Sequence, residues 1–151
     1  MLRRLAVTTV MLLTTLGCGS TPDPFAAPPD VAAPPADAQK TASGIASKML
    51  RVGVGSIRPT ANSTVTVNYT LWTTDGKFWE SSLKSAPGQA AQPATFRLSG
   101  VIPGWTEGLQ LMVAGEKRRF WIPGNLAYGE TGPPNEPHGM LVFDIELLNI
   151  R

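Results

Sequence analysis

One short stretch, residues 101–112, constrains the fold of this chain more than any other segment. Trp105, Leu109 and Met112 recur at i, i+4 and i+7, which places them along one face of a helix of about two to three turns. Pro103 suits the first turn of that helix, and Gly115 is a typical stop. Because so short a helix is marginal by itself, its apolar face has to pack on other structure. The pattern therefore predicts one short helix pressed against a sheet.

The segments on either side of this helix have the two-residue period of strands with one buried face. Residues 65–71 alternate apolar and polar side chains, and residues 140–150 do so again. The predicted strands are 49–54, 65–71, 78–79, 95–98, 117–122 and 140–150, with irregular loops at 83–93 and 129–139. Such strands and a single helix indicate an α+β domain, in which the helix packs on an antiparallel sheet. The basic residues 117–119 are most simply a solvated strand face.

The first 17 residues have the parts of an export signal. Arg3 and Arg4 are followed by an apolar run over residues 5–16, which is too short to span a bilayer comfortably as a helix. The run ends in Thr-Leu-Gly-Cys at residues 15–18, which resembles a bacterial lipobox. We therefore expect residues 1–17 to be a lipoprotein signal peptide and Cys18 to be lipidated. The alternative is an ordinary signal peptide followed by an incidental cysteine.

Residues 18–43 differ sharply in composition from the rest of the chain. Six prolines alternate with alanines there, and Phe25 and Val31 are almost the only larger apolar side chains. Such a segment buries too little surface to offset its ordering entropy, so it is expected to be a disordered tether. An extended proline-rich chain rises about 3.1 Å per residue, so the tether could hold a domain up to roughly 75 Å from an anchor. Residues 44–151 are then the folded domain.

Composition excludes several classes of function. The formal charge of +2 comes from Arg3 and Arg4, and the remaining 11 basic residues balance 11 acidic ones, so we expect no nucleic-acid partner. A single cysteine rules out an internal disulfide and a cysteine zinc site, and the single His138 leaves little for metal chemistry. No P-loop, G-x-S-x-G, H-E-x-x-H or dinucleotide-binding turn is present. We therefore expect neither a metal nor a cofactor.

Several short motifs occur together in the second part of the chain. They are VNYT at residues 67–70, DGK at 75–77, SS at 81–82, VIPGWTEG at 101–108, AYG at 127–129 and LVFDIELL at 141–148. In order and spacing they resemble the FK506-binding protein family over about residues 44–151. The resemblance implies a curved antiparallel sheet wrapped around one short helix, and peptidyl-prolyl cis–trans isomerase activity.

The resemblance also implies a binding pocket. Trp105 would form its floor, and the Tyr128 hydroxyl would reach a carbonyl of the bound peptide. The walls would come from Tyr69, Val101, Ile102 and Phe143, with Trp79 and Glu80 at the positions of the family's wall phenylalanine and aspartate. Those two residues depart from the family pattern, and an arginine that often partners the aspartate has no equivalent. Taken singly, most of these side chains would be interpreted as core or loop residues.

The resulting hypothesis is a lipid-anchored prolyl isomerase in the bacterial cell envelope, facing the periplasm. Its partners would be proline-containing polypeptides, with macrolide inhibitors as a further possibility, and the protein would be a monomer. Two alternatives remain open. One is a non-catalytic peptide-binding or chaperone module on the same fold, which the departures at Trp79 and Glu80 and the missing arginine favour. The other is a structural envelope lipoprotein, for which the aromatic set would have no purpose.

Overall fold

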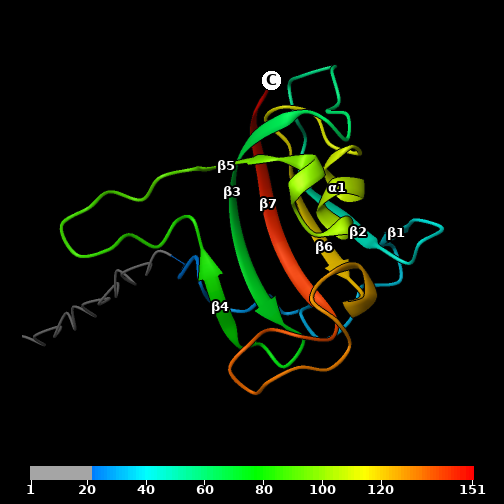
Figure 1. The fold of residues 1–151 in the computed structure, drawn as a ribbon, viewed down its shortest axis with the longest axis vertical. Helices are drawn as coiled ribbons and strands as arrows, with labels where there is room; N and C mark the ends of the chain where they lie inside the picture. Colours follow the sequence, from blue (N-terminus) through cyan, green and yellow to red (C-terminus); the bar gives the residue numbers. More distant parts are fainter. Residues whose placement is uncertain (1–21) are drawn as a thin grey trace, which may run out of the picture.

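The computed structural model describes residues 22–151 and has one short helix packed on one face of a curved antiparallel sheet (Figure 1). The predicted signal peptide and Cys18 lie outside the described residues. The elements are β1 (Gln39–Lys40), β2 (Ala46–Arg51), β3 (Thr64–Thr73), β4 (Phe78–Ser81), β5 (Ala94–Arg97), α1 (Pro103–Leu109), β6 (Lys117–Ile122) and β7 (Leu141–Ile150). Two short 3-10 turns, η1 (Leu98–Gly100) and η2 (Gly124–Leu126), complete them. Among residues 22–151, no helix has the length and apolar character that crossing a bilayer requires.

The sheet confirms the α+β fold that the alternation predicts. Its strand order is β1-β2-β6-β7-β3-β4, with β5 also paired to β3, and every pair is antiparallel. The central pair β3 and β7 runs from Val65 opposite Ile150 to Thr73 opposite Leu141. Because neighbouring side chains alternate between faces, the apolar set of both strands points toward α1 and is buried. The buried members of this set are Val65, Val67, Leu71, Leu141, Phe143, Ile145 and Leu147.

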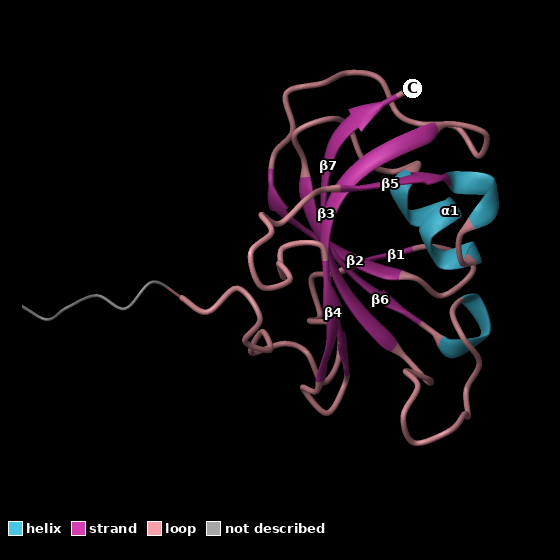
Figure 2. Ribbon diagram, turned by 60° about the vertical axis from the view of Figure 1, so that its left-hand side comes forward, coloured by secondary structure: helices cyan, strands magenta, loops and turns pink. Residues whose placement is uncertain are grey.

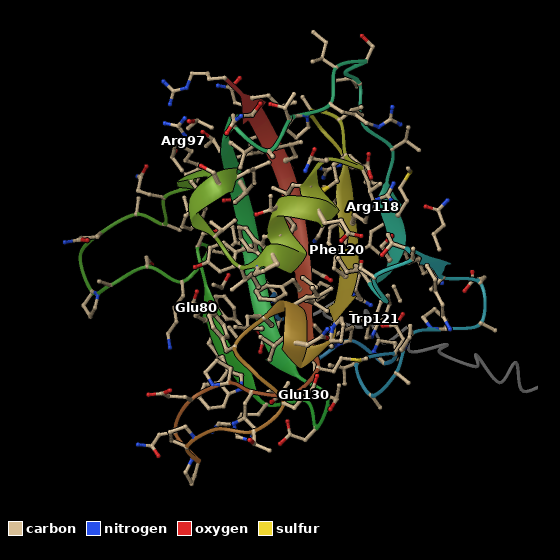
Figure 3. All side chains as sticks on the ribbon, turned by 45° about the vertical axis from the view of Figure 1, so that its right-hand side comes forward. Glu80, Arg97, Arg118, Phe120, Trp121 and Glu130 are labelled. Atoms are coloured by element: carbon tan, nitrogen blue, oxygen red, sulfur yellow. The ribbon has the colours of Figure 1, made fainter. Side chains whose placement is uncertain are left out.

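Helix α1 is shorter than predicted, because it ends at Leu109 and two tight turns follow it. The amides of Leu111 and Met112 donate to the carbonyls of Gly108 and Leu109, both at 3.1 Å. Met112 is fully buried all the same, so the apolar stripe was predicted correctly although the helix does not extend to it. Gly108 allows α1 to lie close to β6, since a Cβ at this position would stand 2.9 Å from Cε1 of Phe120 (Figure 3).

The predicted first strand, 49–54, was placed too late in the chain. Strand β2 ends at Arg51, and the chain then leaves the sheet with Val52 and Val54 75% and 95% exposed. Gly53 allows the departing chain to lie against the turn before β6, where a Cβ would stand 2.8 Å from the Ala114 carbonyl oxygen. The apolar residues of this segment therefore do not indicate a buried strand.

Within residues 22–43, the structure differs from the disordered tether that was predicted. Residues 23–38, called the N-terminal strap below, cover the face of the sheet away from α1 (Figure 2). The indole N–H of Trp72 donates to the Phe25 carbonyl at 2.9 Å, and that of Trp121 donates to the Asp30 carbonyl at 3.1 Å. Val31 packs against the same cluster, in which Trp121 and Val142 are fully buried.

The strap is ordered because of the sheet rather than because of its own side chains. Two large indoles on the outer face supply the apolar surface that the strap lacks, and their N–H groups need acceptors once they are buried. A proline-rich segment can supply carbonyls without bringing many N–H groups that need partners of their own. An ion pair adds to this contact, since Arg119 binds Asp30 of the strap and also Asp144, the latter at 2.6 Å.

The basic residues 117–119 are also not the solvated face that was predicted. Arg118 is buried and its Nε lies 2.5 Å from Oε1 of Glu116, which is buried too. The Arg118 Nη1 donates to the Ser47 hydroxyl at 3.2 Å and to Gln39 Oε1 at 3.1 Å. A buried ion pair needs further hydrogen bonds to offset its desolvation, and β1 and β2 supply them.

Candidate functional site

An aromatic bowl of about 300 Å³ opens between α1 and the sheet. Each surrounding element contributes a side chain: Tyr69 from β3, Glu80 from β4, Phe96 from β5, Trp105 from α1 and Phe143 from β7. The loop residues Gly100, Val101, Ile102 and Tyr128 complete the lining.

Trp105 forms the centre of the bowl. It is 5% exposed, and three other rings meet its indole edge-on. The ring centroids of Tyr69, Phe96 and Phe143 lie 5.2, 5.4 and 5.5 Å from that of Trp105, with interplanar angles of 84°, 90° and 80°. Edge-to-face pairs of this kind are favourable and hold each ring in a defined orientation. The bowl is therefore rigid and mostly apolar at its base.

The Trp105 indole N–H has no hydrogen-bond partner, and it is the one such buried side-chain atom within residues 22–151. Leaving a buried donor unpaired costs on the order of 1–3 kcal/mol. Groups of this kind are uncommon in native proteins, and functional sites are one of the places where they occur.

Two phenol groups and one carboxylate form the polar rim. The Tyr69 hydroxyl donates to Oε1 of Glu80 at 2.5 Å. Burial raises the pKa of Tyr69 well above its usual range, and the hydrogen bond and charge of Glu80 raise it further. Burial and then the charge of Glu80 also raise the pKa of Tyr128. Both hydroxyls therefore stay protonated at neutral pH, and the 58% exposed Tyr128 is free to donate to a bound molecule.

A second cavity of about 510 Å³ adjoins the bowl, and Glu80 and Tyr128 line both. Trp79 lines this second cavity and not the bowl. Its indole N–H donates to the Thr73 hydroxyl at 3.0 Å, and Nζ of Lys77 lies 3.9 Å from the ring centroid. The rest of the lining comes from Leu71 and from a loop with Thr131, Gly132, Pro133, Glu136, Pro137 and His138.

The structure thus brings together seven of the eight residues expected in the pocket, and places Trp79 beside them. Sequence reasoning missed Phe96, which it assigned only to a strand. A signal was present, because Phe96 stands two residues before the fully buried Leu98 on a segment leading into the helix. Its contact with Trp105 depends on the pairing of β5 with β3, which the local pattern does not specify.

A sheet wrapped around one helix, with an aromatic bowl at the start of that helix, defines a class of domain that known proteins share. The family model described as FKBP-type peptidyl-prolyl cis-trans isomerase matches residues 55–148. The chain therefore belongs to this family, as its motifs predicted.

Named relatives agree with this assignment. The isomerase FkpA of Aeromonas hydrophila is 45% identical over 114 residues, which cover 75% of this chain and 40% of the relative. The outer membrane protein MIP of Legionella longbeachae is 42% identical over 111 residues, covering 72% of this chain and 45% of the relative. This chain thus spans less than half the length of these two relatives.

Solved structures share the fold. The crystal structure of FkpA from Escherichia coli superposes with a TM-score of 0.67 at 39% identity, covering 78% of this chain and 53% of the other. A peptidyl-prolyl isomerase from Pseudomonas syringae superposes with a TM-score of 0.65 at 37% identity, covering 77% and 82%.

Proposed function

We propose that this protein is a peptidyl-prolyl cis–trans isomerase whose bowl holds the proline ring of a client polypeptide. The observation that carries the proposal is the Trp105 indole enclosed edge-on by three aromatic rings. Such a floor is flat, apolar and rigid, and it matches the compact pyrrolidine ring.

The reaction requires rotation and no bond breaking. Turning an X–Pro amide costs about 18–20 kcal/mol, because the resonance of the planar amide is lost in the twisted state. Water stabilises the polarised planar amide more than the twisted one, so a bowl that excludes water removes part of that preference. Catalysis follows if the bowl fits the twisted amide better than the planar one.

The rim supplies the polar contacts that orient the chain. The protonated Tyr128 hydroxyl can donate to a carbonyl of the bound peptide, while the Tyr69–Glu80 hydrogen bond holds the opposite wall. The second cavity continues from the bowl past Glu80 and Tyr128, so residues flanking the proline extend into it.

A proline-isomerisation assay on a short Xaa-Pro peptide tests the proposal. We expect the wild-type protein to accelerate the exchange, and Trp105→Leu to remove most of the acceleration. The alternative is a non-catalytic binding module, which the placement of Trp79 outside the bowl favours. Binding of proline peptides without acceleration of any of them would establish that alternative.

We further propose that the protein acts as a monomer in the cell envelope, anchored through lipid on Cys18 and facing the periplasm. The support is the apolar run that ends at Cys18 and the similarity to MIP, which is named an outer membrane protein. Membrane fractionation of Cys18→Ser tests the anchor, since the variant should be released from the membrane.

Macrolide inhibitors should compete with the peptide for the bowl, and a displacement titration would measure this competition.

A further inference from the structure

Strand β4 carries two residues that line the cavities but is itself weakly held in the sheet. It has four residues, lies at the end of the strand order and pairs only with β3. The pairing involves Thr70, Leu71 and Trp72 and is interrupted by a register shift between the last two. An edge strand with so few partners needs other contacts to keep a fixed position.

The N-terminal strap supplies such contacts on the outer side of the β3–β4 hairpin. The ring of Phe25 lies 5.2 Å from the ring of Phe78, the first residue of β4. The hairpin turn also lies against the strap, since a Cβ on Gly76 would stand 3.4 Å from the Cβ of Ala27. Phe25 is held in turn by the hydrogen bond from the Trp72 indole to its carbonyl.

The other end of the strap is fixed on a different strand. Asp30 accepts a hydrogen bond from the Trp121 indole through its carbonyl and binds Arg119 through its carboxylate, and both partners lie on β6. In the strand order, β7 and β3 separate β6 from β4. The strap therefore bridges the sheet from an inner strand to the edge strand.

We propose that the N-terminal strap positions the pocket wall, with Phe25 as the positioning residue that holds β4. Phe78 is followed directly by Trp79 and Glu80, so a shift of Phe78 moves both cavity-lining side chains. Glu80 can accept the Tyr69 hydrogen bond only while β4 keeps its place beside β3. The strap lies before residue 55, where the family match begins. The effect on catalysis rests on the proposed isomerase function.

Phe25→Ala in the full-length protein tests the proposal. We expect kcat/KM for a proline peptide to fall roughly tenfold, because small displacements of positioning groups are costly in rate. Phe78→Ala should have a similar effect, and the double variant should be no worse than either single one. Phe25→Leu, which keeps an apolar contact, should restore most of the activity. Val52→Ala, at an exposed residue away from the strap, is the control.

A second readout separates this proposal from the proposed function. The chain has two tyrosines, so in a Tyr128→Phe background the phenol absorbance of Tyr69 can be titrated alone. Phe25→Ala should bring that titration closer to pH 10, because the contact with Glu80 is weakened, while circular dichroism stays native. This result is expected even if the protein isomerises no peptide. Unchanged kcat/KM together with an unchanged Tyr69 titration in folded Phe25→Ala would overturn the proposal.

Discussion

Trp105 is the residue on which the geometry of the bowl depends, because three rings take their orientation from its indole. Trp105→Leu should lower kcat/KM by about tenfold or more, equivalent to about 1.4 kcal/mol of transition-state stabilisation. The protein should still fold, since leucine keeps the site apolar. An isomerisation assay measures the loss, and a native circular dichroism spectrum of Trp105→Leu distinguishes loss of the bowl floor from loss of the fold. Equal activity of Trp105→Leu and wild type would exclude the proposed role.

Tyr128 offers a cleaner test of a single contact, because its side chain is mostly exposed. Tyr128→Phe removes only the hydroxyl and should lower kcat/KM about twofold to tenfold, the range for one hydrogen bond. The unfolding temperature should stay unchanged. If activity is unaffected, the hydroxyl does not contact the substrate carbonyl.

The raised pKa of Tyr69 predicts a dependence of stability on alkaline pH. The unfolded chain releases the phenol proton near the ordinary pKa of 10, whereas the folded protein keeps it to higher pH. The stabilising contribution is therefore complete below pH 10 and is lost as the pH rises through the folded pKa. Urea unfolding between pH 9 and pH 11 should show a steeper loss of stability for wild type than for Tyr69→Phe. If the stability of the two proteins fell with pH in parallel, the raised pKa of Tyr69 would be contradicted.

At the scale of single elements, α1 is held by close packing against β6. A Cβ on Gly104 would stand 2.3 Å from Cγ2 of Ile122 and 3.0 Å from the backbone oxygen of Leu126. Gly104→Ala should gain up to about 1 kcal/mol in helix propensity but lose about 1–3 kcal/mol to overpacking, so the net effect is destabilising. Thermal unfolding measures it. Gly100→Ala is the matched control, since its Cβ would meet nothing within 4 Å and the variant should be neutral.

Strand β6 depends on its buried ion pair. Glu116→Gln leaves the Arg118 guanidinium buried without its counter-charge and should cost about 3–5 kcal/mol. The exposed pair between Lys48 and Asp37 at 3.5 Å gives the comparison, because Lys48→Ala should cost no more than about 1 kcal/mol. Denaturant unfolding of both variants measures the difference in the free energy of unfolding. Similar losses for the two variants would show that burial of the Glu116–Arg118 pair contributes little to stability.

The element pattern shows which features local sequence can predict. The alternation of β3 and β7 and the apolar stripe around Trp105 were predicted correctly, because each follows from the period of one element. The end of α1 was missed, since Met112 is buried by a turn that has the same spacing as a helix at that point. Arg118 was interpreted as exposed because its partner Glu116 and the acceptors on β1 and β2 become neighbours only through the pairing of distant strands.

At the scale of the whole molecule, the prediction of a disordered tether was wrong for the same reason, because the contacts that hold the strap come from distant strands. The strap has few apolar side chains, so its composition indicates disorder, and its binding surface is created by Trp72 and Trp121 on two separate strands. The residues that line the bowl could be named from the sequence because they belong to motifs shared with a family, whereas the strap precedes the family match.

Removal of the strap should therefore destabilise the domain. A chain starting at Gln39 keeps β1 but exposes the Trp72 and Trp121 indoles and loses two hydrogen bonds. This should lower the free energy of unfolding by about 2–4 kcal/mol relative to a chain starting at Pro22. Tryptophan fluorescence should shift to longer wavelength as the outer face becomes wet. Equal stability of the two chains would mean that the strap binds without contributing to folding.

The bridge between Asp30 and β6 also sets an order of events during synthesis. Its contacts join residues 89 and 91 positions apart, so the strap leaves the ribosome long before its binding surface exists. Contacts that close such long loops form slowly, and this one also needs β7 in place beside β6 to present Asp144. The outer tryptophans consequently stay uncovered until β6 and β7 have paired, so covering of this face by the strap is a late step of folding.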